Sequence, residues 1–279
     1  SRLAGALSPL VAVVATLVIG FALFTALGKD PWQAFHVFFV KPVDSRYGVG
    51  ELLQKAAPLM LCAIGLAAGY RANVWNIGAE GQLTMGAIAG GGIALAFHDS
   101  ASPLLLPAMI VAGAAGGMAW AAIPAFLRTR FNANEILVSL MLVYVATFTL
   151  SLLVHGPWRD PEGFNFPQSK MFEPVALLPN LLPETRLNVG FLIALAAVAA
   201  GWVFMSRSLV GFQMRVAGLA PAAANYAGIS ARSTVWLGML IGGACAGIAG
   251  IGEAAGPVGQ LLPSISPGYG FAAIIVAFV

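Results

Sequence analysis

Residues 76–82 read Asn76-Ile77-Gly78-Ala79-Glu80-Gly81-Gln82, a polar stretch between two mainly apolar segments. Polar groups at membrane depth are costly and require partners or a function. Glycines there allow close backbone packing or a departure from helical geometry. The flanking segments, 52–70 and 82–97, are short for membrane helices, and short segments of this kind often belong to discontinuous helices. The stretch therefore predicts a break in a membrane helix.

The composition indicates a membrane protein. The 279 residues are 59% hydrophobic and 9% charged, with a mean hydropathy of +0.87, whereas soluble domains carry roughly 25% charged residues. A net charge of +3 without a basic stripe gives no indication of a nucleic-acid partner. Cys62 and Cys245 lie in apolar runs and are interpreted as small core residues.

The charge-free runs predict an all-α, polytopic transmembrane helix bundle with about eight membrane segments, some of them short or broken. A membrane helix needs about 20 residues. Seven candidates are 8–28, 52–70, 82–97, 103–127, 136–154, 188–206 and 233–251, and an eighth begins near Leu261. Segment 8–28 is too long for a typical signal peptide. We expect a single transmembrane domain over 1–279, and a fragment whose C-terminal helices are missing, because the apolar run 271–279 lacks a polar cap.

The distribution of basic residues favours a cytoplasmic N-terminus, although the Lys and Arg counts tie at seven on each side. The inner set is Arg2, Arg71, Arg128, Arg130, Arg207, Arg215 and Arg232; the outer set is Lys29, Lys41, Arg46, Lys55, Arg159, Lys170 and Arg186. The inner arginines lie in short loops near helix ends, whereas the outer residues are mixed with acidic ones in longer loops. The positive-inside rule therefore supports this orientation only through loop length and position.

The outer loop 155–187 is rich in proline and glycine, which predicts turns rather than helix. Trp158, Phe164 and Phe166 could form a docking surface on it. Interfacial aromatic anchoring explains the same residues equally well, and both interpretations stay open.

Polar side chains near the predicted break are candidates for a solute pathway. Asn73, Asn76, Glu80 and Gln82 offer donors and acceptors where apolar runs meet. The structural alternative is a plug in which the amides tie helices together and Glu80 pairs with Arg71 or Arg130.

A second polar pair, Asn134 and Glu135, precedes the segment 136–154. Asn134 can cap that helix, and Glu135 suits its positive N-terminus, so capping alone explains both. The functional interpretation puts them at the cytoplasmic mouth of the pathway.

The segment 242–253 combines small residues with a carboxylate. The pairs Gly243/Gly247 and Ala246/Gly250 favour tight helix packing. Glu253 follows near membrane depth. The sequence of residues 252–256 weakly resembles that of residues 78–81, which is consistent with two related halves of the chain.

The longest inner loop, 207–232, contains a short helix signal. Pro221 can open a helix over 222–226, which Gly228 ends. A short helix of small residues suits a groove in a partner, although an ordinary interfacial turn of helix explains it too.

Signatures of catalysis are absent from the sequence. It contains no Walker A motif, no nucleophile elbow and no metal-binding cluster, and His36, His98 and His155 are scattered. We expect no catalytic residue, no metal site and no cofactor in this chain.

Together these motifs resemble the permease subunit of a bacterial ABC importer, in the nucleoside and simple-sugar branch of the ribose and branched-chain amino acid permease family. The matching pieces run in order along nearly the whole chain: Tyr70-Arg71-Ala72-Asn73 with 76–82, Asn134-Glu135-Ile136 with Met141 and Tyr144, Gly156-Pro157-Trp158 with Phe166-Pro167-Gln168-Ser169, Arg215 and Gly218 with Ala222-Ala223 and Gly228-Ile229, and the glycine-rich run ending at Glu253.

The resemblance implies a multi-pass protein of the bacterial cytoplasmic (inner) membrane that translocates nucleosides, or simple sugars, delivered by an extracytoplasmic substrate-binding protein. The implied partners are an ABC ATP-binding subunit, which binds ATP and Mg, and a second permease subunit, identical or different. The loop 207–232 would be the coupling loop, with Arg215, Gly218, Pro221, Ala222, Ala223 and Gly228 contacting the ATPase. The pathway would use Asn73, Asn76, Glu80, Gln82, Asn134, Glu135 and Glu253.

Three alternatives stay open at this point. The chain could be an ion-coupled secondary transporter, with Glu80 and Glu253 as proton carriers. It could instead be a permease for branched-chain amino acids, or a membrane scaffold whose polar segments only hold helices together.

Overall fold

A computed structural model describes residues 2–278, with side chains from Leu10 onward. The described residues form helices joined by turns and loops, and the only β pairing among them is an isolated bridge between Asn180 and Asn188. The predicted all-α class is thus confirmed. The chain forms two compact units, which divide between Leu52 and Leu53.

The first unit contains α1 (Arg2–Ala26), α2 (Pro31–Phe35), the π-helical η1 (His36–Val40), the 3-10 helix η2 (Lys41–Val43) and the first turns of α3 (Arg46–Arg71). The carboxylate of Asp30 begins α2, because its Oδ1 accepts hydrogen bonds from the backbone N–H groups of Trp32 and Gln33. The ring of Phe21 packs edge-on against Trp32, with 5.7 Å between ring centroids.

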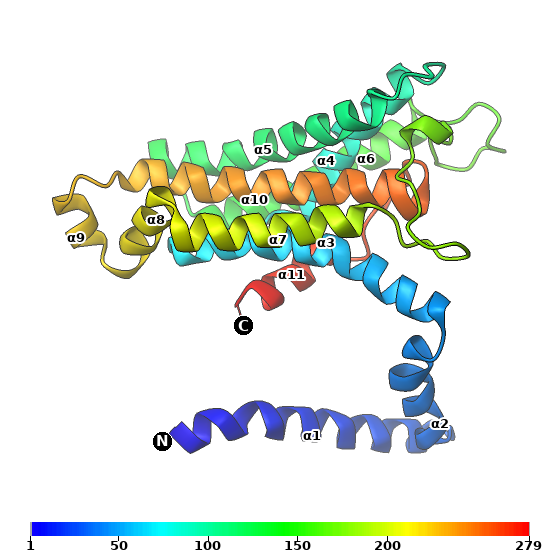
Figure 1. Cartoon of the computed structure of the whole chain (residues 1–279), viewed down its shortest axis with the longest axis horizontal. Helices are drawn as coiled ribbons and strands as arrows, with labels where there is room; N and C mark the ends of the chain where they lie inside the picture. Colours follow the sequence, from blue (N-terminus) through cyan, green and yellow to red (C-terminus); the bar gives the residue numbers. More distant parts are fainter. Residues whose placement is uncertain (1, 279) are drawn as a thin grey trace. The chain divides into compact units, whose positions relative to one another are not determined.

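The second unit is a helix bundle centred on three helices (Figure 1). These are α4 (Ala79–Ala96), α5 (Leu105–Phe131) and α10 (Ala231–Glu253), which pack against one another. Around them lie the rest of α3, α6 (Glu135–His155), α7 (Gly190–Arg207), α8 (Leu209–Leu219), α9 (Pro221–Tyr226) and α11 (Tyr269–Phe278), with the short helices η3 (Pro174–Ala176) and η4 (Ala254–Val258). Among the described residues, five helices are long and apolar enough to cross a membrane: α3, α5, α6, α7 and α10 continued through η4.

Glycines bring the central helices into backbone contact. A β-carbon at Gly247 of α10 would overlap the carbonyl oxygen of Gly113, and one at Gly243 would meet the backbone of Gly117, both in α5. On the other side, Gly86 of α4 lies against Gly247 itself. The predicted close packing of Gly243 and Gly247 is therefore confirmed, since small residues let helices approach closely in lipid.

The predicted segments correspond to helices, with one correction at the C-terminal side. The eighth segment does not begin near Leu261, because α11 begins only at Tyr269. Pro263 and Pro267 interrupt the intervening stretch, and the Ser266 hydroxyl accepts a hydrogen bond from the Tyr269 N–H at 3.0 Å. Proline and a capping serine thus delay the helix although the sequence is apolar.

The second unit has two chemically different ends. At one, α3, α5 and α7 end, α10 begins, and α8 and α9 project (Figure 1). We call it the basic end, because it holds Arg71, Arg128, Arg130, Arg207, Arg215 and Arg232. The opposite end, here the loop end, consists of residues 97–104, 156–189 and 254–261.

Candidate functional site

The predicted helix break lies between α3 and α4. Beyond α3, Asn73 adopts a left-handed conformation with φ of 57°, and its Oδ1 accepts a hydrogen bond from Trp75 Nε1 at 2.9 Å. Residues 74–78 are not helical, and α4 begins at Ala79. The break is thus confirmed, but it ends before Glu80, which lies in the first turn of α4.

Two amide side chains fill the break and bind each other. Asn76 Nδ2 donates to Gln82 Oε1 at 2.8 Å, and Gln82 Nε2 donates back to Asn76 Oδ1 at 3.0 Å. Asn76 Oδ1 also accepts from the N–H of Gly78 at 3.0 Å. Both side chains are buried, and Asn76 lies beside Gly242 in the middle of α10. The pair therefore satisfies its own polar groups inside the bundle, as buried amides must.

The carboxylate of Glu80 joins two helix N-termini. Its Oε2 accepts a hydrogen bond from the backbone N–H of Gly270 at 2.6 Å. Gly270 is the second residue of α11, while Glu80 itself is in the first turn of α4. Negative charge is favourable at the positive end of a helix dipole. The partner of Glu80 is thus a backbone amide, and no ion pair with Arg71 or Arg130 occurs among the described residues.

Asn134 and Glu135 lie at the basic end, where α6 begins. Asn134 Oδ1 accepts from the backbone N–H groups of Ile136 and Leu137, at 2.9 and 3.3 Å, so the predicted N-cap is confirmed. Glu135 forms an ion pair with Arg128 in the last turn of α5. Their placement at the mouth of a pathway stays a prediction.

The remaining predicted pathway residue, Glu253, is the buried last residue of α10 and lies toward the loop end. The structure therefore pairs Asn76 with Gln82 and joins Glu80 to α11, but leaves Glu135 and Glu253 at opposite ends of the bundle. Sequence reasoning missed Ser139 of α6, whose hydroxyl accepts from the Ile77 N–H at 3.2 Å and holds the break against α6.

At the loop end, residues 156–189 fold mainly as turns, as predicted, with the short 3-10 helix η3 and the bridge between Asn180 and Asn188 among them. The loop is attached to the segment after α10. The Phe172 N–H donates to the Gly259 carbonyl and the Leu178 N–H to the Ala255 carbonyl, both at 2.8 Å. The Leu261 N–H donates to the Ser169 hydroxyl at 2.9 Å. No local pattern could reveal these long-range contacts. They make the loop a fixed surface above the bundle.

The three aromatic residues of this loop have different environments. Trp158 packs against Gly92 of α4 and is partly buried. Phe164 and Phe166 are 92% and 64% exposed. Arg159 donates to Asn165 Oδ1 at 2.6 Å, which holds the turn that presents them. Trp158 thus packs on the bundle, whereas Phe164 and Phe166 project from the loop. Docking and interfacial anchoring by these residues both stay predictions.

At the basic end, the predicted short helix is confirmed. Pro221 is the first residue of α9, and Gly228 follows the helix with φ of 79°. The side of α9 that carries Ala222 and Ala223 is exposed, and Tyr226 is 97% exposed. Sequence reasoning missed Tyr226, although an aromatic residue at the end of an otherwise small-residue helix was the available signal.

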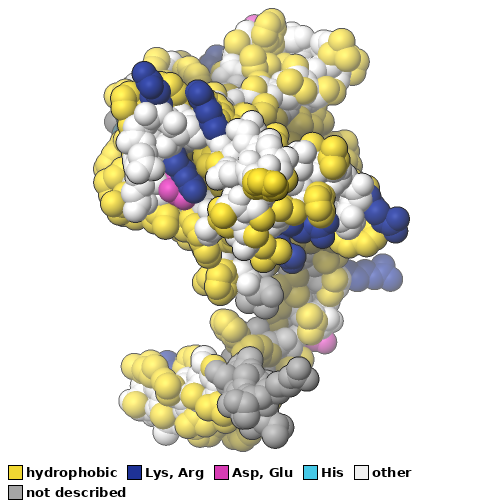
Figure 2. Space-filling model, turned by 90° about the vertical axis from the view of Figure 1, so that its left-hand side faces the viewer, with side chains coloured by type: hydrophobic (Ala, Val, Ile, Leu, Met, Phe, Trp, Pro, Cys, Tyr) yellow, Lys and Arg dark blue, Asp and Glu magenta, His cyan; other side chains and the backbone are white. Residues whose placement is uncertain are grey.

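The other residues predicted to contact an ATPase have different neighbours. A β-carbon at Gly218 would overlap the carbonyl oxygen of Arg71, so α8 packs directly on the end of α3. Arg215 lines a groove between α3, α7 and α8. Figure 2, which views the basic end, shows Lys and Arg side chains standing around the projecting helices. Within the described residues, no three His, Cys, Asp or Glu side chains could hold a metal ion.

Comparison with known proteins identifies relatives over nearly the whole chain. Residues 48–279 match the family described as branched-chain amino acid transport system / permease component. The glucose ABC transporter permease protein TsgB13 of Haloferax volcanii is 40% identical over 98% of this chain and 74% of its own length.

Two further relatives carry nucleoside names. The nucleoside ABC transporter permease protein NupB of Lactococcus lactis is 30% identical, over 88% of this chain and 69% of its own length. The guanosine ABC transporter permease protein NupP of Bacillus subtilis is 31% identical, over 100% of this chain and 80% of its own length. No solved structure matches the chain.

Proposed function

This chain belongs to the family of permease components of branched-chain amino acid transport systems, and we propose that it is the membrane subunit of an ATP-driven importer for sugars or nucleosides. The observation that carries the proposal is the match across residues 48–279, which includes the broken helix, the loop 156–189 and α9. A chain of this family is a permease rather than an enzyme. ATP hydrolysis then belongs to a separate subunit.

The substrate class rests on the relatives. Their names specify glucose, nucleosides and guanosine. These solutes share a polyhydroxylated sugar ring, and we propose that this ring is what the permease passes. Branched-chain amino acids lack the ring and are therefore the less favoured substrate.

The orientation follows from charge at the ends of the second unit. The basic end has arginines with Glu135 as an acidic neighbour, whereas the loop end mixes basic residues with Asp99, Asp160, Glu162, Glu173 and Glu184. Positive charge near helix ends favours the cytoplasmic side. We propose that the basic end is cytoplasmic. Because α3 then begins outside, a single crossing by α1 leaves the N-terminus inside.

The two ends then suit two partners. The exposed side of α9, with Ala222, Ala223 and Tyr226, is offered to the ATPase subunit, and Gly218 fixes α8 on the end of α3, while Arg215 stands beside this contact. The exposed Phe164 and Phe166 are offered to the substrate-binding protein. Exposed aromatic residues commonly contribute strongly to protein interfaces.

The helix break is proposed to open during transport. In the present conformation the amides of Asn76 and Gln82 are buried and bind each other. Rocking of the permease between outward-facing and inward-facing states requires an element with two packings. We propose the non-helical residues 74–78, held by side-chain hydrogen bonds, as that element. The further polar groups proposed for the route are Asn73, Glu80, Asn134, Glu135 and Glu253.

Co-purification tests the subunit assignment. The full-length permease, expressed with its neighbouring genes, should copurify with an ATP-binding subunit, and the partner binding protein should bind a sugar or a nucleoside in a ligand screen. A permease that never copurifies with an ATPase, yet takes up solute on a proton gradient, would instead be a secondary transporter with Glu80 and Glu253 as proton carriers.

A further inference from the structure

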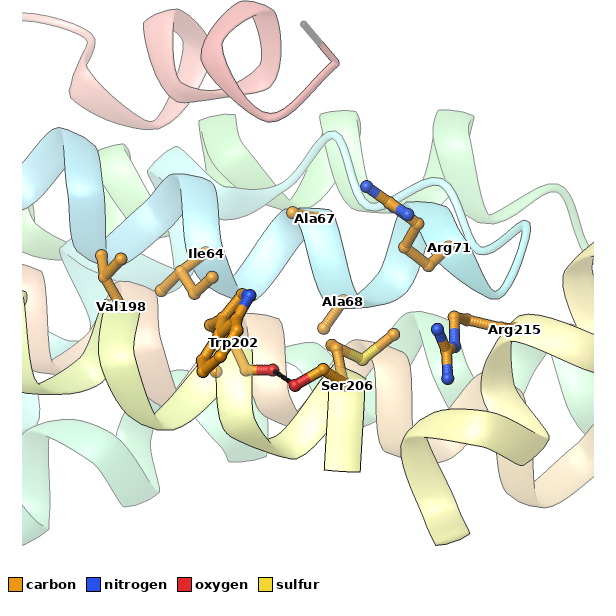
Figure 3. Close-up of a pocket in the computed structure, with 10 residues that line it drawn as sticks. Ile64, Ala67, Ala68, Arg71, Val198, Trp202, Ser206 and Arg215 are labelled. Atoms are coloured by element: carbon orange, nitrogen blue, oxygen red, sulfur yellow. Dashed lines mark hydrogen bonds between the residues drawn. The ribbon is translucent and has the colours of Figure 1, made fainter. Parts of the chain in front are cut away.

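A groove of about 380 Å³ runs along the second unit between α3, α7 and α8. Figure 3 shows that its lining changes along its length. Ile64 and Val198 line the part nearer the middle of the helices, and Trp202 follows. Arg71 and Arg215 stand at the other extreme, which is the basic end. The groove is therefore apolar at one extreme and cationic at the other.

The two arginines lack a carboxylate partner. Ion pairs of the described residues join Arg128 to Glu135 and His98 to Glu173, and neither pair includes Arg71 or Arg215. In addition, Nε of Arg215 is buried and makes no hydrogen bond. A buried donor without an acceptor is costly, so this nitrogen points to an acceptor that the described residues do not supply.

The polar groups of the groove suit an anion rather than a neutral solute. Its lining residues include no carboxylate and no amide side chain. The Ser206 hydroxyl already donates a hydrogen bond to the Trp202 carbonyl oxygen, at 2.7 Å. A neutral polyol would need acceptors as well as donors, whereas guanidinium groups match phosphate geometry.

We infer that this groove binds an anionic phospholipid. Its phosphate would lie at the basic end of the groove, at the unpaired Nε of Arg215 and in the positive field of Arg71, and an acyl chain would extend past Trp202 toward Ile64 and Val198. The order of apolar and cationic groups along the groove matches a lipid seated in the leaflet at the basic end. Basic pockets between membrane helices bind anionic lipid headgroups in this way.

The bound lipid would brace the coupling region. Arg71 is the last residue of α3, immediately before the helix break, and Arg215 belongs to α8, which leads into α9. A phosphate bound at Arg215 would lie where α8 meets the end of α3, next to the backbone contact at Gly218. This consequence for coupling rests on the proposed function, whereas lipid binding itself does not.

Fluorescence quenching of Trp202 tests the site. The full-length permease complex is placed in phosphatidylcholine nanodiscs that contain brominated phosphatidylglycerol or, at equal mole fraction, brominated phosphatidylcholine. The Trp202 signal is the difference between wild type and Trp202→Phe. We expect stronger quenching by phosphatidylglycerol. Arg71→Gln with Arg215→Gln should raise the lipid fraction for half-maximal quenching about tenfold.

The controls distinguish lipid binding in this groove from non-specific attraction of anionic lipid to the positive charge of the basic end. Arg207→Gln removes an exposed arginine outside the groove and should leave the lipid preference unchanged. The double variant Arg71→Lys, Arg215→Lys keeps both positive charges and should retain most of the lipid preference. It also tests whether substitution at these two positions by itself causes misfolding. Equal quenching by both lipids would overturn the proposal. So would loss of the preference in Arg207→Gln alone, or displacement by soluble glycerol phosphate, which would indicate a phosphate site.

Discussion

Glu80 has a position that sequence reasoning could describe only in part. The residue lies inside the bundle, in the first turn of α4, and its carboxylate accepts the N–H of Gly270 in α11. Two helix dipoles thus stabilise one buried charge. Because Gly270 is 190 residues away in sequence, neither the residue type nor its spacing could reveal this partner.

Replacing Glu80 with glutamine separates its charge from its hydrogen bond. Since the glutamine carbonyl can still accept from Gly270, we expect Glu80→Gln to assemble with the ATPase while losing about 1 kcal/mol of stability and part of its uptake. Thermal unfolding and uptake of the full-length complex measure both, and Glu162→Gln in the exposed loop is the control. Failure to assemble would indicate a purely structural residue, and full uptake would remove Glu80 from the solute route.

The amide pair predicts non-additive substitutions. Gln82→Leu should cost about 1–3 kcal/mol of unfolding free energy, because Asn76 is left buried without its partner. The double variant Asn76→Leu, Gln82→Leu should cost less than the sum of the single variants. Gln33→Leu, at an exposed amide, provides the comparison. Additive costs in the thermal unfolding series would mean that the two amides act independently.

At the scale of elements, glycines determine how α10 packs. Gly247 contacts both α5 and α4, whereas a β-carbon at Gly252 of the same helix would have nothing within 4 Å. The two glycines therefore form a matched pair: both lie in α10, but Gly247 is closely packed and Gly252 has open space around it.

Alanine at these positions should have opposite effects. Gly247→Ala should destabilise by about 1–3 kcal/mol, because the new methyl group forces α10 away from α5. Gly252→Ala should be neutral or stabilise by up to about 1 kcal/mol, because alanine favours helix. Thermal unfolding of the purified full-length protein measures both. Equal destabilisation by the two substitutions would contradict the packing described.

Elements governed by local signals could be predicted from the sequence, and those governed by distant contacts could not. The Asn134 cap and the helix from Pro221 to Tyr226 depend on neighbouring residues, and both predictions are confirmed. The spacing of small residues in α10 is also a local signal, and it correctly predicts close packing without identifying the partner helices. The apolar run predicts that α11 begins near Leu261, which is wrong, because Pro263 and Pro267 delay its start to Tyr269.

The partners of the buried polar groups were beyond the reach of the sequence for the same reason. The contacts of the loop 156–189 with residues 255–261 and that of Ser139 with Ile77 join segments far apart in the chain. Hydropathy predicts that such polar groups need partners, but not which ones.

At the scale of the whole molecule, the second unit has a different exposed surface at each end. Tyr226→Ala should weaken association with the ATPase but leave binding of the substrate-binding protein unchanged. Phe164→Ala should do the reverse, since each substitution removes an exposed aromatic contact from one end, worth about 2 kcal/mol if it is central to its interface. Pull-down of each partner by the full-length permease measures both. Impairment of both associations by either variant would argue against two separate docking surfaces.

The central claim, transport driven by a partner ATPase, is tested most directly by uptake in proteoliposomes that contain the full-length permease complex. With the substrate-binding protein outside and ATP available to the ATPase, labelled glucose or guanosine should accumulate, and a proton gradient without ATP should give none. A hydrolysis-deficient ATPase should abolish accumulation while the complex stays assembled. Accumulation on the proton gradient alone, or undiminished uptake with the inactive ATPase, would contradict the account.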